Sequence, residues 1–238
     1  MIIRRSASSQ QLITQPAHAA LAARIMREWQ PSHFPDSPRK NSILNAVEHH
    51  DIGWTEVDAT LVVDETTQQL LDFTELSDAL KQDTSSRGIE RLRDDPYAAA
   101  LVSQHRLHVY RRYSEQRDWI DFFAGVTAAR DAYLRASGAG SLDQLLRDYA
   151  FVRAGDLASL AFCNDWTNTP DDGCGYSMRL DGTALTIVPD PFAGRVIEIS
   201  IEAREIPNQR FASAHDARAV LTEAPVVTIR GTVNGSAV

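Results

Sequence analysis

The sequence has 238 residues, enough for one large domain or for a main domain with a smaller appendage. Its 24 Lys and Arg residues against 32 Asp and Glu residues give a formal net charge of −8. This acidity argues against a general binder of nucleic acid or of anionic membranes, because such a protein needs a basic face. We therefore expect a small-molecule partner. A local basic pocket could still draw on Arg39, Lys40, Arg87, Arg91 and Arg106.

Cys163 and Cys174 are the two cysteines, too few for a disulfide framework and without the spacing of a zinc ribbon. The N-terminal segment MIIRRSASSQQ lacks the apolar core of a signal peptide. No uninterrupted apolar stretch approaches the length of a membrane span. These patterns predict a cytoplasmic protein.

Apolar residues recur at helical spacing from about Thr14 to Cys163. In the first expected helix, Thr14 can cap, Pro16 lies near the start, and Leu21 and Ile25 share one face. Further helices are expected over about 39–51, 75–81, 86–93, from residue 96, over 114–136 and over 141–160, with an irregular connection over 55–73. Gly155, inside the last of these helices, is typical of a close approach by another element.

The pattern changes at Tyr176, after which apolar residues alternate or form short β-branched blocks. Strands are expected over 176–180, 184–188, 196–203 and 226–233, with a short helix over 215–222. The sequence therefore predicts a mainly α fold, with a helical domain over residues 1–170 and a small β-rich subdomain over 171–238 packed on it.

Ionisable residues fall in phase with the apolar faces of several helices. His18, His50, His105 and Asp156 each lie on the apolar stripe of a different helix, and Asp51 directly follows His50. Buried ionisable groups are unfavourable unless they are paired or bound to metal. A divalent cation offers these residues one common partner, because imidazole and carboxylate both suit Zn, Fe and Mn.

Each of these residues also has a simpler interpretation. A single core histidine such as His18 is commonly bonded to a backbone carbonyl, and Asp156 could cap a helix or form a salt bridge. His105 could pack in the core and His108 could be exposed, while His49 points away from the apolar stripe. A metal-free, hydrogen-bonded core stays an alternative.

The order of a His, a His-Asp pair and a later Asp resembles the HD superfamily, in which such residues bind metal inside a helical bundle. The stretches LITQPAHAALA, AVEHHDIGW, DPYAAALVSQHRLHVY and AGDLASLAFC are similar to a bacterial family of HD-like proteins that is labelled only as a domain of unknown function. The resemblance covers nearly the whole chain. It implies an HD-like helical bundle with metal ligands at His18, His50, Asp51 and Asp156. His105 would then lie behind the ligands, contact a substrate phosphate or bind a second metal.

The resemblance suggests a metal-dependent phosphohydrolase, whose cation lowers the pKa of water and polarises a phosphoryl oxygen. Asp51 would act as a ligand or position the attacking water, and His105 would donate a proton or stabilise phosphate charge. Four further residues are candidates for substrate binding, namely His49, His108, Arg106 and Trp54, and Arg91 is a second candidate for the phosphate. The sequence does not distinguish Fe, Mn, Zn, Co, Ni and Mg.

Two other functions stay open. HD-type proteins with two irons include oxygenases, and His105 and His108 are the residues here that could extend the site to a second metal. Alternatively, the chain is a non-catalytic module that binds metal or a small ligand, and its β tail offers a partner surface or the edge of a homodimer. The coordination of the metal discriminates between them, because a closed site is structural and an open one is catalytic.

Overall fold

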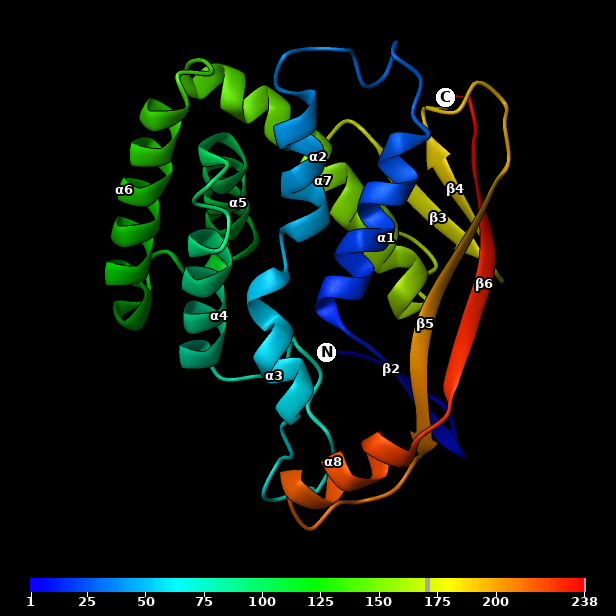
Figure 1. Ribbon diagram of the computed structural model, residues 1–238. Coiled ribbons are helices and arrows are strands. Elements are labelled where there is room, and N and C mark those ends of the chain that lie inside the picture. Colours follow the sequence, from blue (N-terminus) through cyan, green and yellow to red (C-terminus); the bar gives the residue numbers. More distant parts are fainter. Residues whose placement is uncertain (170–171, 238) are drawn as a thin grey trace.

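The computed structural model describes residues 1–169 and 172–237, which form a mixed β-sheet with helices packed against one side of it (Figure 1). The α-helices are α1 (Gln15–Arg27), α2 (Lys40–His49), α3 (Thr55–Thr60), α4 (Asp78–Glu90), α5 (Pro96–Val109), α6 (Ile120–Ser137), α7 (Leu142–Asn164) and α8 (Ala214–Glu223). Short 3-10 helices cover Ile52–Trp54, Arg111–Tyr113 and Arg117–Trp119. The strands are β1 (Ile2–Arg5), β2 (Ser9–Ile13), β3 (Ser177–Asp181), β4 (Ala184–Val188), β5 (Ile197–Pro207) and β6 (Val226–Gly235).

The sheet joins the two ends of the chain. Among the described residues its six strands run in the order β1-β2-β5-β6-β4-β3, with β4 and β6 parallel and the other neighbours antiparallel. The register pairs Leu12 of β2 with Arg204 of β5. The N-terminal strands therefore extend the sheet that the C-terminal strands form.

The expected fold class, a mainly α HD-like bundle with a small C-terminal β subdomain, is wrong. Helices hold 49% of the residues and strands 18%, and the strands build one six-stranded mixed sheet. The physical reason is that β1 and β2 bury Ile2 and Ile13 fully and pair with each other, and the second edge of β2 needs a further strand partner, which β5 supplies. The expected domain boundary between residues 170 and 171 lies outside the described residues, so the domain division stays a prediction.

The individual elements follow the sequence more closely. Thr14 caps α1, because its hydroxyl accepts a hydrogen bond from the Ala17 amide. The two short helices expected between residues 75 and 93 are one continuous helix, α4, and the irregular connection contains the short helix α3. Within the part of the chain that is described, no helix combines the length and the apolar character needed to cross a membrane.

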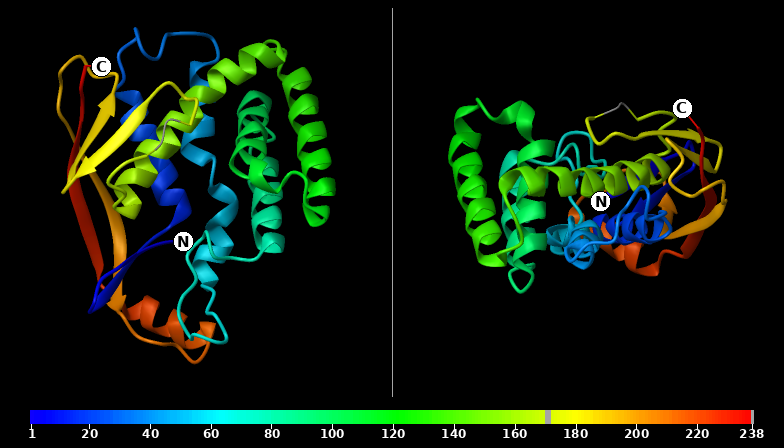
Figure 2. Two further views of the ribbon diagram at one scale, coloured as in Figure 1. Left: turned by 180° about the vertical axis from the view of Figure 1, so that it is seen from behind. Right: turned by 90° about the horizontal axis from the view of Figure 1, so that it is seen from above.

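Helices α1 and α7 lie between the sheet and the outer helices, as the views from behind and from above confirm (Figure 2). Gly155 makes this packing possible, because a Cβ there would lie 2.9 Å from Val47 Cγ1 and 3.1 Å from Met26 Cγ. The predicted close approach is thus confirmed. It brings the face of α7 that carries Asp156 against α1 and α2, which carry or directly precede the histidines of the candidate site.

Candidate metal centre

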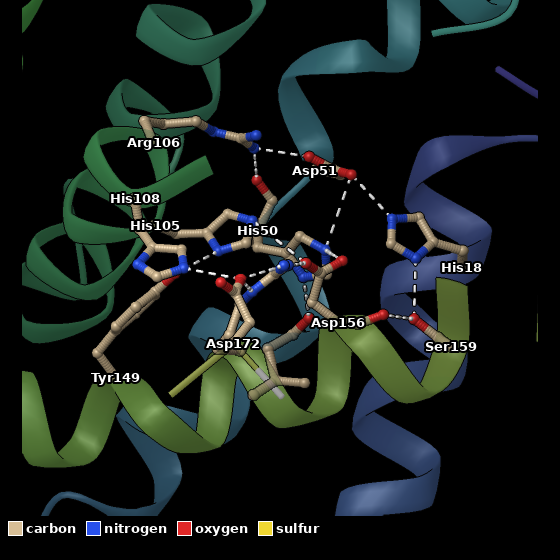
Figure 3. A network of polar contacts seen from close by, with 12 residues as sticks. His18, His50, Asp51, His105, Arg106, His108, Tyr149, Asp156, Ser159 and Asp172 are labelled. Carbon is tan, nitrogen blue, oxygen red and sulfur yellow. Dashed lines mark hydrogen bonds and ion pairs between the residues drawn. The ribbon is translucent and has the colours of Figure 1, made fainter. Parts of the chain in front are cut away.

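The candidate site lies where α1, α5, α7 and the end of α2 meet (Figure 3). On α1, the fully buried His18 ring places Nε2 2.8 Å from Asp51 Oδ2 and Nδ1 2.9 Å from Ser159 Oγ. The Ser159 hydroxyl donates its hydrogen to the Asp156 carbonyl oxygen at 3.0 Å, so its oxygen accepts from His18 Nδ1. A neutral His18 therefore presents a lone pair at Nε2 to the Asp51 carboxylate.

His50 follows α2 directly and is also fully buried. Its Nδ1 donates to the Val47 carbonyl oxygen at 2.8 Å, so in the neutral ring Nε2 carries the lone pair. That Nε2 lies 3.3 Å from Asp156 Oδ1 and 3.7 Å from Asp51 Oδ2, yet among the described residues it meets no atom in good hydrogen-bond geometry. A buried ring nitrogen that faces two carboxylates is a favourable place for a proton or a metal cation.

Gly53 fixes the turn that follows His50. A Cβ at this position would lie 1.9 Å from the Thr84 carbonyl oxygen, so only glycine lets the chain pack against α4 here. The turn places Asp51 beside the His18 ring. Gly53 is thus part of how the site is built.

The two carboxylates are held in the same way. Arg106 donates to Asp51 Oδ1 at 2.7 Å and to the His50 carbonyl oxygen, and Arg153 donates to Asp156 Oδ2 at 2.5 Å. Each carboxylate thereby uses one oxygen for a guanidinium group and turns the other toward His50 Nε2. Partners that orient a carboxylate in this manner are typical of the outer shell of a metal site.

The electrostatic setting favours ionised carboxylates. Burial raises the pKa of Asp51, but the Arg106 guanidinium and His50 outweigh it and hold that pKa well below its ordinary value. For Asp156, burial is likewise outweighed by His50, His105 and Arg153, so its pKa is lowered. Burial also opposes the protonation of His50, yet the two carboxylates raise its pKa. A proton or a metal cation is thus favoured at this point.

These residues fit a divalent cation. The ligand atoms of His18, His50 and Asp51 all lie within 4.8 Å of one another, and so do those of His50, His105 and Asp156. Ligands around zinc at 2.0–2.1 Å in a tetrahedral site lie roughly 3.3 Å apart, close to the spacings observed here. Because His50 uses Nδ1 for a backbone carbonyl, it has one lone pair to give and can join a single ion.

His105, on α5, approaches the carboxylate from the other side. Its Nε2 lies 3.8 Å from Asp156 Oδ2, the oxygen that Arg153 also contacts, and its Nδ1 lies 3.3 Å from the Tyr149 hydroxyl. Burial lowers the pKa of His105 well below its ordinary value, so the ring is neutral at physiological pH. A neutral imidazole beside the carboxylates can accept a proton or bind metal.

A cavity of about 400 Å³ opens beside this cluster, within the range of small-molecule sites. Asp51, Asp156 and His105 form part of its wall. The basic side chains around it are Lys81, Arg106, Arg111, Arg112 and Arg153, and the aromatic ones are Trp54, Phe73, Tyr110 and Trp166. The cavity therefore gives a small molecule access to the two carboxylates along a wall that combines basic and apolar side chains.

A second polar cluster lies at the same cavity. The Asp172 carboxylate accepts hydrogen bonds from Arg153 at 2.6 and 2.8 Å and from Arg111 at 2.6 Å. It also lies 2.9 Å from His108 Nε2. Burial raises the pKa of Asp172, but its bonds to His108 and Arg153 lower it to about 2. Arg153 thus touches both clusters.

The structure brings most of the residues singled out in the sequence together. His18, His50, Asp51, Asp156 and His105 form the buried cluster, while Arg106 and Trp54 line the cavity. His108 pairs with Asp172 beside it.

The other candidates lie elsewhere. His49 Nδ1 lies 3.2 Å from the Asn45 carbonyl oxygen of its own helix, and His49 is outside the set of described residues that line the cavity. Arg91 pairs with Glu56 on the surface and is not among the described residues that line the cavity.

Sequence reasoning missed Arg153, Asp172 and Ser159. Arg153 precedes Asp156 by one helical turn, a spacing that signals an ion pair and could have identified it. Asp172 lies in a loop, where no periodicity shows which side chains it meets. Ser159 carries no charge, so nothing in its pattern separates it from a serine of the core.

Comparison with known proteins gives one match. The family model described as a protein of unknown function (DUF3891) matches residues 1–208. No curated protein and no solved structure matches the chain. The matched range contains every residue of both polar clusters and the cavity, and it shows that the chain belongs to the DUF3891 family.

Proposed function

We propose that this protein is a metal-dependent hydrolase of small phosphoesters. The observation that carries the proposal is the junction of the buried His/Asp cluster with a cavity lined by basic side chains. Asp51 and Asp156 carry two negative charges, and Arg106 and Arg153 offset them with two positive charges. A bound divalent cation would leave a local net charge of +2, which favours an anionic ligand such as a phosphoester.

His18, His50, Asp51 and Asp156 would hold the cation, through His18 Nε2, His50 Nε2 and the carboxylate oxygens that face them. When bound, the cation supplies Lewis acidity and lowers the pKa of a water molecule to near neutrality. Because the donors are imidazole and carboxylate, several first-row divalent metals are compatible.

The remaining residues position the substrate and move protons. Arg106 and Arg153 orient the two carboxylates and present positive charge to a phosphoryl group in the cavity. The neutral His105 ring is placed at the cavity wall to accept a proton at Nε2 or, once protonated, to donate it to a leaving oxygen. Trp54 forms part of the apolar wall.

A relationship to the HD superfamily is part of this proposal. Its support is the order of His18, the His50-Asp51 pair and Asp156 along the chain, together with their convergence from three helical segments. The sheet that covers α1 and α7 distinguishes the chain from a bundle of helices alone.

The test uses protein loaded in turn with Mn, Mg, Fe, Co, Ni and Zn, assayed against phosphomonoesters, phosphodiesters and nucleotides. We expect hydrolysis with at least one metal. The reaction should be lost in His50→Ala and reduced roughly 100-fold or more in His105→Asn, since general acid–base catalysis contributes about 10²–10⁴-fold. His49→Asn, the matched control on the neighbouring histidine, should keep its rate. Absence of hydrolysis with every metal, or equal rates for the His50 and His49 variants, would sink the proposal.

The alternatives receive less support. A di-iron oxygenase needs ligands for two ions, whereas the two candidate ligand groups share the single free lone pair of His50. A purely structural cation would be closed off by protein ligands, whereas here both carboxylates reach the cavity wall. One bound ion per chain together with phosphoester hydrolysis would distinguish the proposed hydrolase from the di-iron oxygenase and from a protein with a purely structural cation.

A further inference from the structure

Three basic side chains converge on the Asp172 carboxylate at the edge of the cavity. Figure 3 shows one of them, His108, beside Asp172. His108 lies on α5, Arg111 follows that helix, and Arg153 lies on α7. One oxygen of Asp172 faces Arg111, while the other faces both His108 and Arg153. The Asp172 side chain is 14% exposed, so this carboxylate is largely withdrawn from water.

Asp172 has more basic partners than a surface ion pair usually provides. A surface ion pair joins one acid to one base and contributes about 0–1 kcal/mol. Here two guanidinium groups and an imidazole surround one carboxylate, and the arginine fork geometry suits carboxylate and phosphate alike. The same N–H groups would bind any small oxyanion in place of the Asp172 carboxylate.

The position of the cluster connects it to the metal centre. Arg153 contacts Asp156 Oδ2 at 2.5 Å and Asp172 Oδ2 at 2.6 Å, so a single guanidinium separates the two carboxylates. Arg111, Arg153 and Asp172 all line the cavity that reaches Asp51. A ligand in this cavity can therefore span both places.

We propose that His108, Arg111 and Arg153 form an anion-binding subsite, which the Asp172 carboxylate occupies until a ligand displaces it. The inference rests on the proposed function only for the position of the reacting group. It specifies the substrate class as a small molecule with two anionic groups. One is the phosphoester at the metal centre, and the other is a carboxylate or phosphate bound in the subsite.

Anion binding is measured directly, without turnover, so that its failure and the failure of the hydrolase proposal are distinguishable. Sulfate and acetate are the probes, titrated by calorimetry at constant ionic strength against the full chain, with and without chelator. Asp172→Asn should bind sulfate about tenfold more tightly than the native chain, since removing the competing carboxylate is expected to contribute about 1.4 kcal/mol. A larger gain for acetate than for sulfate assigns the subsite to carboxylates, and the reverse assigns it to phosphates.

Two variants control for the change of charge. Glu56→Gln removes an acid that pairs with Arg87 and Arg91 on the open surface, and we expect no comparable gain there. Arg111→Gln combined with Asp172→Asn should remove the gain, because the subsite then lacks one of its arginines. An Asp172→Asn chain that binds both anions no better than Glu56→Gln shows that the cluster only anchors the loop, and it overturns the proposal.

A measurement on the native chain covers the case in which Asp172→Asn fails to fold. Arg111 is 57% exposed and Arg93 is 66% exposed, so phenylglyoxal can modify both. At a saturating concentration, sulfate or acetate should protect Arg111 while Arg93 stays reactive, as read by peptide mass spectrometry. Equal modification of Arg111 with and without either anion contradicts the subsite.

Discussion

The two polar clusters of this molecule share Arg153 but differ in how their charges are met. In the outer cluster, the Asp172 carboxylate has basic partners on both oxygens. In the inner cluster, His50 Nε2 lies fully buried between two carboxylates and among the described residues meets no atom in good hydrogen-bond geometry. Basic protein groups therefore pair the outer carboxylate on both sides, whereas the inner cluster places a buried ring nitrogen between two carboxylates. The contrast supports the proposals of a metal at the inner cluster and of an exchangeable anion at the outer one.

The largest expected difference between the clusters concerns their arginines. Arg106→Met should lower the free energy of unfolding of the metal-free chain by about 3–5 kcal/mol, because it leaves Oδ1 of the buried Asp51 carboxylate without its guanidinium partner. Arg111→Gln, at the 57% exposed side chain, should lower it by less than about 1 kcal/mol. Denaturant unfolding measures both values. Similar losses for the two variants would remove the distinction between a buried and an exchangeable cluster.

A smaller effect is expected behind the His18 ring. Ser159→Ala removes the acceptor that holds His18 Nδ1, so metal affinity should fall about 10–100-fold. Ser103→Ala is the matched control, since Ser103 is also buried but donates only to the Ala99 carbonyl oxygen of its own helix. Competition with a fluorescent chelator gives both affinities. Unchanged affinity in Ser159→Ala would show that His18 is not held for metal.

Packing at α7 gives the next effect. Gly155→Ala forces a Cβ to within 2.9 Å of Val47 Cγ1 and should lower the stability by about 1–3 kcal/mol, while moving Asp156 away from His50. Gly125→Ala on α6 is the control, because a Cβ there meets no atom within 4 Å. It should instead stabilise the chain by up to about 1 kcal/mol. Thermal unfolding distinguishes the two, and a neutral Gly155→Ala would contradict the close approach of α7.

The smallest effect concerns pH and the outer cluster. The pKa of Asp172 is lowered from 3.8 to about 2 in the folded chain, so its ionised form stabilises the fold above about pH 4. As the pH falls from about 4 to 2, Asp172 is protonated in the unfolded chain before it is protonated in the folded chain. The stabilisation by the ionised carboxylate is therefore lost over this range. The stability lost in Asp172→Asn should be about 1 kcal/mol or less near neutrality, allowing for solvent screening. This loss should vanish near pH 2, and urea unfolding at several pH values measures it. A loss that stays the same at every pH would show that folding does not shift the pKa of Asp172.

The inner cluster could be predicted from the sequence because its residues lie on helices. Helical phase alone separates the buried His50 from its neighbour His49 and places His18 and Asp156 on inward faces. Gly155, a glycine inside a helical pattern, predicted the close packing of α7 in the same way. Periodicity is a local signal, and each of these residues carries it within its own helix.

The sheet and the outer cluster depend on contacts between distant parts of the chain. β1 and β2 are short, and β2 pairs with β5, nearly two hundred residues later in the chain. No local sequence pattern predicts such a distant strand partner. Asp172 lies outside any regular element, and its meeting with Arg111 is decided by the path of its loop. The sequence therefore predicts the convergence of His18, His50, Asp51 and Asp156 correctly and the fold class wrongly.

The central claim is that the inner cluster holds one divalent cation, and metal analysis of the purified chain tests it most directly. Inductively coupled plasma mass spectrometry should find about one equivalent in the native chain and in His49→Ala, and far less in His50→Ala and Asp156→Ala. The His49 variant matters most, since it makes the same substitution one residue away from the proposed ligand. Equal metal content in His50→Ala and His49→Ala, with both chains folded, would contradict the claim.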